Sequence, residues 1–169
     1  ITTASGPPET VALGLVIAAL MIWRTKRYAP ALILLGTVAL ATIVCTALKI
    51  FVGRERPPIA IQLMLETDPS FPSGHVTGTA TLLLMTAIAI GARKSRTVRT
   101  MLVCAAVAIA VIVGVTRLYI GVHWLTDVCA GMLVAALCAL LGAQALRFAD
   151  ARRVHNFAAP TRTTKGITV

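Results

Sequence analysis

Charged side chains are scarce in this chain, and acidic side chains are the scarcest of all. Only 13% of the 169 residues are charged, with 6 Asp and Glu against 16 Lys and Arg. By contrast, 57% of the residues are hydrophobic, and the mean hydropathy is +0.86. A soluble domain of this length needs far more polar surface to stay in solution. The composition therefore excludes an ordinary soluble domain and predicts an integral membrane protein.

Aromatic residues are also few, at 5% of the chain. A formal net charge of +10 would suit a nucleic-acid-binding protein, but the Lys and Arg residues form no single basic face. So few aromatic rings provide no platform on which bases could stack. We therefore expect no nucleic-acid partner.

Cysteines in the arrangement of a metal site or a disulfide framework are missing as well. The four cysteines all lie inside apolar runs without the spacing of metal ligands, which is typical of small buried hydrophobic residues. We therefore expect no metal and no cofactor. The cysteines are Cys45, Cys104, Cys129 and Cys138.

The front of the chain also lacks the basic region, short apolar core and cleavage site of a signal peptide.

Long apolar segments dominate what is present. Five of them are close to the roughly 20 residues that a helix needs to cross a bilayer core of about 30 Å. Ala, Gly and Thr scattered along them suit close helix packing in lipid. The sequence therefore predicts an all-α integral membrane helical bundle. The expected helices cover approximately residues 7–23, 29–52, 73–92, 97–116 and 123–146.

These helices are expected to form one membrane-embedded domain over residues 1–149. The remaining residues, 150–169, mix Arg, Thr, Pro and Gly without a period, which predicts a flexible basic tail. The sequence does not indicate an oligomeric state.

The basic residues indicate how the chain is oriented, because short cytoplasmic loops collect Lys and Arg. Twelve of the 16 fall on one side of an alternating path through the membrane. We therefore expect a multi-pass protein of the cell membrane with that side, and the C-terminus, in the cytoplasm. The twelve are Arg24, Lys26, Arg27, Arg93, Lys94, Arg96, Arg99, Arg147, Arg152, Arg153, Arg162 and Lys165.

The other four basic residues fall at the extracytoplasmic helix ends, together with two histidines and a carboxylate. They belong to three blocks, KIFVGRERP (49–57), PSGH (72–75) and TRLYIGVHWLTD (116–127). Ionisable groups that cluster at a membrane face normally poor in cations indicate a functional site. The group consists of Lys49, Arg54, Arg56, Arg117, His75, His123 and Asp127.

The cations in these blocks suit an anion with several oxygens, and phosphate is the leading candidate. Arg56 and Arg117 carry planar guanidinium groups that match phosphoryl oxygens, and Lys49 adds a compact charge. Ser73 and Gly74 are expected at the start of a helix. There, free backbone N–H groups and the helix dipole favour an anion, and glycine permits its close approach.

The histidines and the carboxylate are suited to catalysis. His123 and Asp127 are four residues apart on a predicted helix, so the carboxylate can accept one ring proton and leave the other nitrogen as a nucleophile. His75 is then placed to protonate the leaving oxygen. A phosphohistidine formed in this way and hydrolysed by water divides the reaction into two steps, with the cations neutralising charge in place of a metal.

Taken singly, several of these residues have simpler interpretations. A histidine at a helix end commonly lies at the interface or caps the helix, and Lys49 can extend to the lipid headgroups. Asp127 is harder to explain alone, because an unpaired carboxylate within an apolar helix is costly. His155, in the polar tail, is interpreted as solvated.

In combination, the three blocks carry a resemblance to a known family. The pattern K-x6-R-P, then P-S-G-H, then R-x5-H-x3-D resembles the signature of the type 2 phosphatidic acid phosphatase (PAP2) family. These lipid phosphatases share the motif with vanadium haloperoxidases and glucose-6-phosphatase. The resemblance extends from about Pro7 to Leu146, and it implies His123 as nucleophile, His75 as general acid and Asp127 as the partner of His123. The phosphate-binding residues that it implies are Lys49, Arg56, Ser73, Gly74 and Arg117.

Two departures from the family pattern are visible. The third block usually opens with serine before the arginine, whereas Thr116 stands here; a hydroxyl is kept, so we expect little loss. Bacterial members usually have six helices, with the first block at the end of the third, but here it ends the second. We therefore expect that one N-terminal helix of the full-length protein is missing from this chain.

The resemblance implies a membrane lipid phosphatase that removes the terminal phosphate of a lipid phosphate or diphosphate in the outer leaflet. By analogy with the family, polyprenyl (undecaprenyl) diphosphate is the favoured substrate, and phosphatidylglycerophosphate and phosphatidate are alternatives. Residues 59–66, IAIQLMLE, are expected to lie in the membrane interface beside the substrate's entry.

Two other functions are weighed against this one. A haloperoxidase holding vanadate is disfavoured because those relatives are soluble. A non-catalytic lipid-phosphate binder or transporter would be expected to lack one of the two histidines, and both are present; the sequence also shows no inverted repeat.

Overall fold

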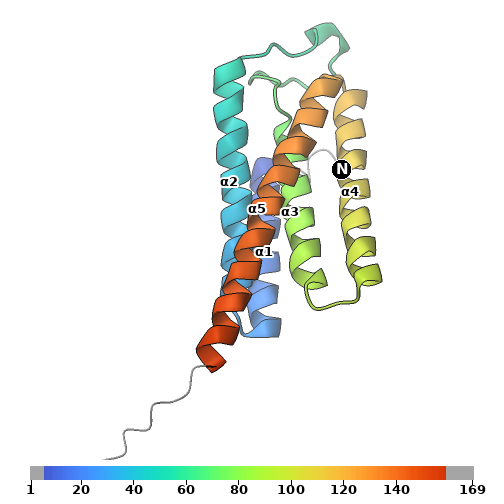
Figure 1. Cartoon of the computed structure of the whole chain (residues 1–169). Helices are drawn as coiled ribbons and strands as arrows, with labels where there is room; N and C mark the ends of the chain where they lie inside the picture. The colour runs from blue at the N-terminus through green and yellow to red at the C-terminus, as the bar shows by residue number, and fades with distance from the viewer. Residues whose placement is uncertain (1–5, 159–169) are drawn as a thin grey trace, which may run out of the picture.

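The computed structural model describes residues 6–158, and it confirms the predicted all-α bundle (Figure 1). Within that range there are five long helices, a short 3₁₀ helix and no strand. Each long helix is long and apolar enough to cross a membrane. The elements are α1 (Pro7–Thr25), α2 (Ala29–Val52), η2 (Ile59–Ile61), α3 (Gly74–Gly91), α4 (Arg96–Tyr119) and α5 (Leu125–Ala158).

The last helix differs from its prediction at both ends. It begins at Leu125, two residues after His123, and continues to Ala158 instead of ending near residue 146. Residues 150–158, expected in a flexible tail, are therefore helical. Within this extension, Asp150 forms an ion pair with Arg27 of the α1–α2 turn, at 2.6 Å between Nη2 and Oδ1. The division into a domain and a tail stays a prediction, and residues 159–169 lie outside the described part.

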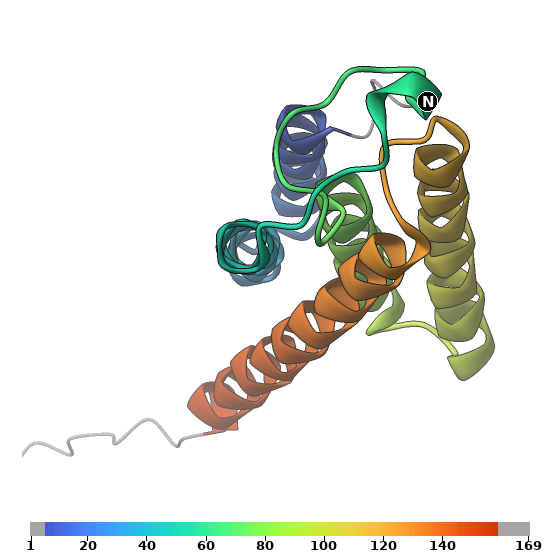
Figure 2. The ribbon, with the colours of Figure 1, turned by 90° about the horizontal axis from the view of Figure 1, so that it is seen from above.

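Helix α3 lies at the centre of the bundle, where it contacts all four other long helices (Figure 2). Its close contacts rely on small side chains. Ala80 of α3, Ala110 of α4 and Ala135 of α5 meet in one cluster and are fully buried. Small residues let helix backbones approach closely, which is how helices associate in lipid. The central helix is thereby fixed at the position from which it presents its N-terminus to the site.

The hydroxyl groups inside α3 are satisfied within the helix itself. Thr77 donates to the carbonyl oxygen of Ser73 at 2.8 Å, and Thr81 donates to that of Thr77 at 2.7 Å. A polar group without a partner is costly where no water is available. These threonines can therefore be buried at the helix contacts.

The outer surface of the bundle is apolar. Ile43 of α2, Ile112 of α4 and Leu140 of α5 are 65%, 55% and 62% exposed, respectively. A soluble protein rarely exposes so continuous an apolar surface. These side chains are placed to contact lipid.

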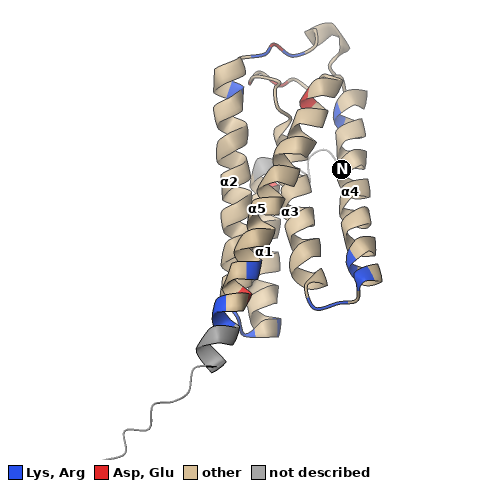
Figure 3. Ribbon diagram, in the orientation of Figure 1, with Lys and Arg blue, Asp and Glu red and all other residues tan. Residues whose placement is uncertain are grey.

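The connecting segments separate into two ends of the bundle (Figure 1). The α2–α3 segment and the α4–α5 turn lie at one end, together with all three blocks. The α1–α2 turn and the α3–α4 loop lie at the other, where Figure 3 shows further Lys and Arg residues. The predicted grouping is therefore seen for the basic residues of the described part, whereas Arg162 and Lys165 lie outside it. Which end faces the cytoplasm stays a prediction.

A close contact holds residues 59–66, here named the η2 segment, against the α4–α5 turn. Gly121 has φ of 71°, and a Cβ atom there would lie 2.3 Å from the carbonyl oxygen of Ile61. Next to it, the N–H group of Leu63 donates to the carbonyl oxygen of Ile120 at 2.9 Å. Because glycine alone fits both the positive φ and the contact, Gly121 allows the segment that follows the first block to lie against the third block.

Helix packing is tested by adding one methyl group to α5. A Cβ atom on Gly142 would lie 2.5 Å from Thr37 Oγ1, which is fixed by its own hydrogen bond to Ile33, and 2.6 Å from Met85 Sδ. We expect Gly142→Ala to lower the free energy of unfolding by about 1–3 kcal/mol, measured by thermal unfolding in detergent.

Gly36→Ala is the matched control, because a Cβ atom there has no neighbour within 4 Å. We expect it to be neutral or to stabilise by up to about 1 kcal/mol, since alanine is the better helix former. Equal effects of the two substitutions would contradict the described packing of α5 against α2 and α3.

Candidate active site

The three blocks meet at one end of the bundle, each beside a helix terminus. Lys49 lies in the last turn of α2. Gly53 caps the end of this helix with a φ of 58°, and its N–H group donates to the carbonyl oxygen of Lys49 at 3.0 Å. Ser73 is the N-cap of α3, and its backbone N–H donates to the carbonyl oxygen of Asp127 at 3.0 Å. Arg117 lies in the last turn of α4 and is fully buried.

The Asp127 carboxylate is the polar centre of the site and is itself fully buried. One oxygen, Oδ2, accepts the Trp124 N–H at 2.8 Å and lies 3.4 Å from His123 Nδ1. The other, Oδ1, lies 3.0 Å from Arg54 Nη1. An acidic side chain in the first helical turn that reaches back to the N-cap N–H is a known way to start a helix. Asp127 therefore begins α5 and holds His123 at the same time.

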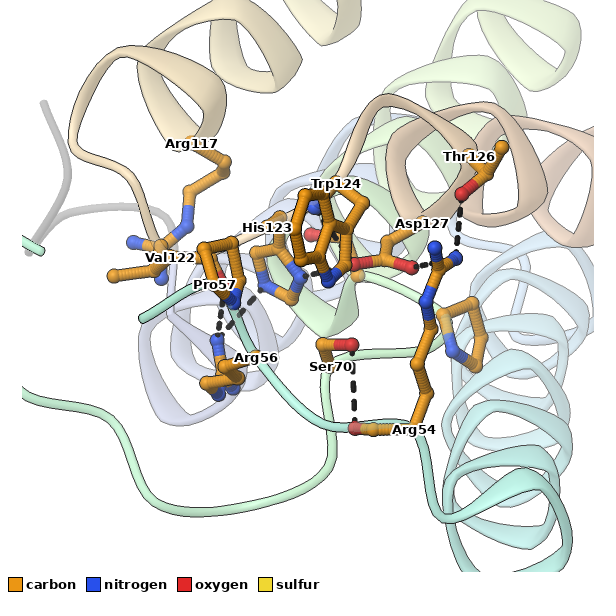
Figure 4. A network of polar contacts seen from close by, with 12 residues as sticks. Arg54, Arg56, Pro57, Ser70, Arg117, Val122, His123, Trp124, Thr126 and Asp127 are labelled. Atoms are coloured by element: carbon orange, nitrogen blue, oxygen red, sulfur yellow. Dashed lines mark hydrogen bonds and ion pairs between the residues drawn. The ribbon is translucent and has the colours of Figure 1, made fainter. Parts of the chain in front are cut away.

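The predicted pairing of His123 with Asp127 is present, but the predicted reason for it was wrong. His123 does not lie on α5, so the two residues do not share a helix face. Instead, the turn before Leu125 folds the imidazole back over the first turn of α5. Figure 4 shows the ring between Asp127 on one side and Arg56 on the other.

The second ring nitrogen of His123 faces a donor. Nε2 lies 3.4 Å from Arg56 Nη1. A guanidinium group can only donate, so Nε2 acts as the acceptor in this arrangement and the ring proton is assigned to Nδ1, toward Asp127. This tautomer places the lone pair of the ring on Nε2, the nitrogen that faces away from Asp127.

The imidazole of His123 is held in the neutral form. Burial, and after it the nearby charges of Arg56, Arg117, Lys49 and His75, together lower its pKa to about 3. At neutral pH the ring is therefore unprotonated, as a nucleophile must be. The effect of His75 also means that the two histidines, from different blocks, are within electrostatic range of each other.

Two acidic residues that sequence reasoning missed neutralise the predicted phosphate-binding cations. Asp68 contacts Lys49 Nζ at 2.8 Å and Arg56 Nη2 at 2.6 Å. Glu66 contacts Arg56 Nη2 at 2.8 Å and also pairs with Arg117. Burial alone would raise the pKa of Asp68, but its contacts with Lys49 and Arg56 outweigh burial and lower it. The signal available in the sequence was their rarity, because the chain has only 6 acidic residues.

Arg54 belongs to the predicted cluster of ionisable residues, but sequence reasoning assigned it no role in the site. Its Nη1 contacts both Asp127, at 3.0 Å, and Thr126 Oγ1, at 2.5 Å. Its guanidinium carbon lies 5.6 Å from the ring centroid of Trp124, within range of a cation–π interaction. The sequence signal was its position at a membrane face where few cations are expected.

Several buried donors in the site have no partner within the described residues. They are the Ser73 hydroxyl and the Nε and Nη1 groups of Arg117, all in fully buried side chains. A buried donor without an acceptor is costly, so such groups indicate the place of a ligand with acceptor oxygens. Gly74 lies beside them, where an added Cβ atom would be 3.9 Å from Lys49 Cε. Residues 6–158 contain no cluster of three or more His, Cys, Asp or Glu side chains suited to a metal ion.

Two solved structures are similar to this chain in fold. A transmembrane PAP2 type phosphatidylglycerolphosphate phosphatase from Bacillus subtilis has a similar crystal structure, with a TM-score of 0.76 and 26% identity, over 95% of this chain and 76% of that one. Aquifex aeolicus LpxE is similar in fold, with a TM-score of 0.59 and 24% identity, over 82% of this chain and 83% of that one. No match was found among curated proteins.

A model of the PAP2 superfamily matches residues 30–150, which include all three blocks. The predicted family resemblance is therefore confirmed. With this match over most of its length, and with the fold of a membrane phosphatase, the chain belongs to the PAP2 superfamily of membrane phosphatases.

Proposed function

We propose that this chain hydrolyses the terminal phosphate of a membrane lipid phosphate or diphosphate through a phosphohistidine at His123. The observation that carries the proposal is the set of buried donors without partners on Ser73 and Arg117, beside a neutral histidine. A phosphoryl group supplies the acceptor oxygens that these donors lack.

Binding is expected to exchange one set of anions for another. Glu66 and Asp68 hold the guanidinium and ammonium groups that a phosphate would contact. Entry of a phosphoryl group displaces these carboxylates, and the cations are already oriented when it arrives. Charge-assisted contacts of this kind stabilise the additional negative charge that develops in the transition state.

The chemistry then takes two steps. In the first, His123 Nε2 forms a bond to phosphorus, the bond from phosphorus to the leaving oxygen breaks, and His75 gives that oxygen a proton. In the second, water attacks phosphorus, its proton passes to His75, and the bond to Nε2 breaks to release inorganic phosphate. Asp127 stabilises the positive charge that His123 acquires during the first step.

An apolar groove next to the site supports a lipid substrate. A cavity of about 370 Å³ lies between α1, α2 and α3 and reaches from Val11 and Thr42 to Lys49 and Gly74. A hydrocarbon chain in this groove would bring its terminal phosphate to the cations. Such an arrangement favours an amphiphile over a soluble phosphate ester.

The identity of the lipid belongs to the same proposal. Polyprenyl diphosphate is our favoured substrate by family analogy, and the site is proposed to face the extracytoplasmic side because most Lys and Arg lie at the other end of the bundle. The Bacillus subtilis relative, described as a phosphatidylglycerolphosphate phosphatase, favours phosphatidylglycerophosphate as the alternative.

Removal of the nucleophile tests the reaction. We expect His123→Ala to lower phosphate release by on the order of 10³-fold or more, because no other group then forms the covalent intermediate. The measurement is phosphate release in detergent from undecaprenyl diphosphate, phosphatidylglycerophosphate and phosphatidate, with and without a chelator. The ranking of the three lipids assigns the substrate.

His155→Ala is the control, since this histidine belongs to none of the three blocks. It should keep the parent activity. Undiminished release by the His123 variant would refute the phosphohistidine mechanism, and release abolished by the chelator would refute its independence of metal.

Replacement of Arg54 tests whether it positions the His123–Asp127 pair. We expect Arg54→Gln to lower kcat about 10- to 100-fold with little change in KM, because Asp127 then loses its second partner and His123 is held less firmly. Arg54→Lys should recover part of the loss. Steady-state kinetics on the preferred lipid separate the two parameters.

Glu55→Gln is the matched control for Arg54, because it changes an adjacent, exposed charge and leaves Asp127 untouched. Thermal unfolding should show that each variant remains folded. A parent-like kcat in folded Arg54→Gln would mean that Arg54 serves the fold alone.

The apolar η2 segment is tested with membrane-embedded substrate. Ile61, Leu63 and Leu65 are 59%, 68% and 70% exposed at the end of the bundle that carries the site. We expect their replacement by serine to reduce hydrolysis of a long-chain lipid in vesicles several-fold, because contact with the interface is lost. The variant should hydrolyse a short-chain soluble phosphate at the parent rate. If it also hydrolyses the long-chain lipid at the parent rate, a role of these side chains in lipid entry is excluded.

A further inference from the structure

A second cavity lies at the end of the bundle opposite the candidate active site. It has a volume of about 610 Å³ and is formed by α1, α3, α5, the α1–α2 turn and the start of the α3–α4 loop. It shares no residue with the three blocks. Its apolar walls are provided by Ile17, Leu20, Met21, Ala89, Ile90 and Leu146.

Cations surround this cavity in excess. Arg24, Arg27, Arg93 and Lys94 line it, whereas Asp150 is its only acidic lining residue. Arg27 is paired with Asp150 at 2.6 Å. The side chains of the other three cations form no hydrogen bond or ion pair with any residue in the described part of the chain. The cavity therefore carries three uncompensated positive charges.

The arrangement combines two features that one kind of ligand requires together. The apolar walls run along helices that span the membrane, and the cations come from the segments at the helix ends (Figure 3). An acyl chain can lie along the walls while a phosphate contacts the guanidinium and ammonium groups. A soluble anion would have no use for the apolar walls, and a neutral lipid would leave the charges unpaired.

We propose that this cavity binds the headgroup and the first part of an acyl chain of an anionic phospholipid, from the leaflet at that end of the bundle. Basic pockets between membrane helices are known to hold such headgroups. The bound lipid would contact α1, α3 and α5 at once. It would thereby stabilise this end of the bundle, where the Arg27–Asp150 ion pair also links the α1–α2 turn to α5.

The test compares two triple variants with the same loss of charge. In the cavity variant, Arg24, Arg93 and Lys94 are replaced by glutamine. In the control variant, Lys26, Arg96 and Arg147 are replaced instead; these residues lie toward the same end of the bundle but do not line the cavity. Each protein is delipidated in detergent and titrated with phosphatidylglycerol or with phosphatidylcholine.

Two readouts are followed, the thermal unfolding midpoint and the mass of retained lipid in native mass spectrometry. Ligand that binds only the folded state raises the midpoint. We expect phosphatidylglycerol to stabilise the parent and the control and to remain bound to both. The cavity variant should bind it about 100-fold more weakly, since each of the three cations near the headgroup contributes roughly fivefold.

The result is independent of catalysis, because neither readout requires turnover. Equal responses of the two triple variants would overturn the proposal in favour of general surface attraction. Equal stabilisation of the parent by phosphatidylcholine would also overturn it, as would a lipid-free dimer that the cavity substitutions abolish, because a second copy of the chain would then be the occupant.

Discussion

The site depends on one buried carboxylate. Asp127 is fully buried near the end of an apolar bundle, where a charge without partners would be too costly to retain. Its partners come from different parts of the chain: Arg54 follows α2, and His123 and Trp124 precede α5. Satisfying the carboxylate therefore brings the first block to the third. The orientation of the nucleophile follows from the requirement that Asp127 be paired.

The rest of the site is governed by the balance of charge. Lys49, Arg56 and Arg117 are close enough to repel one another, and without counter-charges their convergence would be unfavourable. Glu66 and Asp68 supply those charges in the substrate-free protein. In the proposed reaction the same cations would meet a phosphoryl group by exchanging partners, so little new order would have to be created on binding.

Much of the fold could be predicted because hydropathy alone decides which segments cross a bilayer. The residues of the three blocks could be selected because cations and histidines are unexpected at that membrane face. Helix ends were less predictable: α5 starts at Leu125 because Asp127 caps it, a contact that hydropathy does not reveal. Glu66 and Asp68 lie in an irregular segment without periodicity, so only the folded arrangement shows which cations they meet.

Recognition of phosphate and recognition of the lipid are separated within this architecture. The proposed phosphate-binding groups lie on helix ends and turns, held by Asp127 and by the small residues around α3, whereas a lipid tail would contact the helix faces. Away from Lys49 and Asp68, the groove is lined by uncharged side chains, so substitutions among them can change its shape without disturbing any charge. A family built this way can alter its lipid while keeping its chemistry. Under the proposed function the three blocks define the reaction, and the groove between α1, α2 and α3 is where we expect differences in substrate to be encoded.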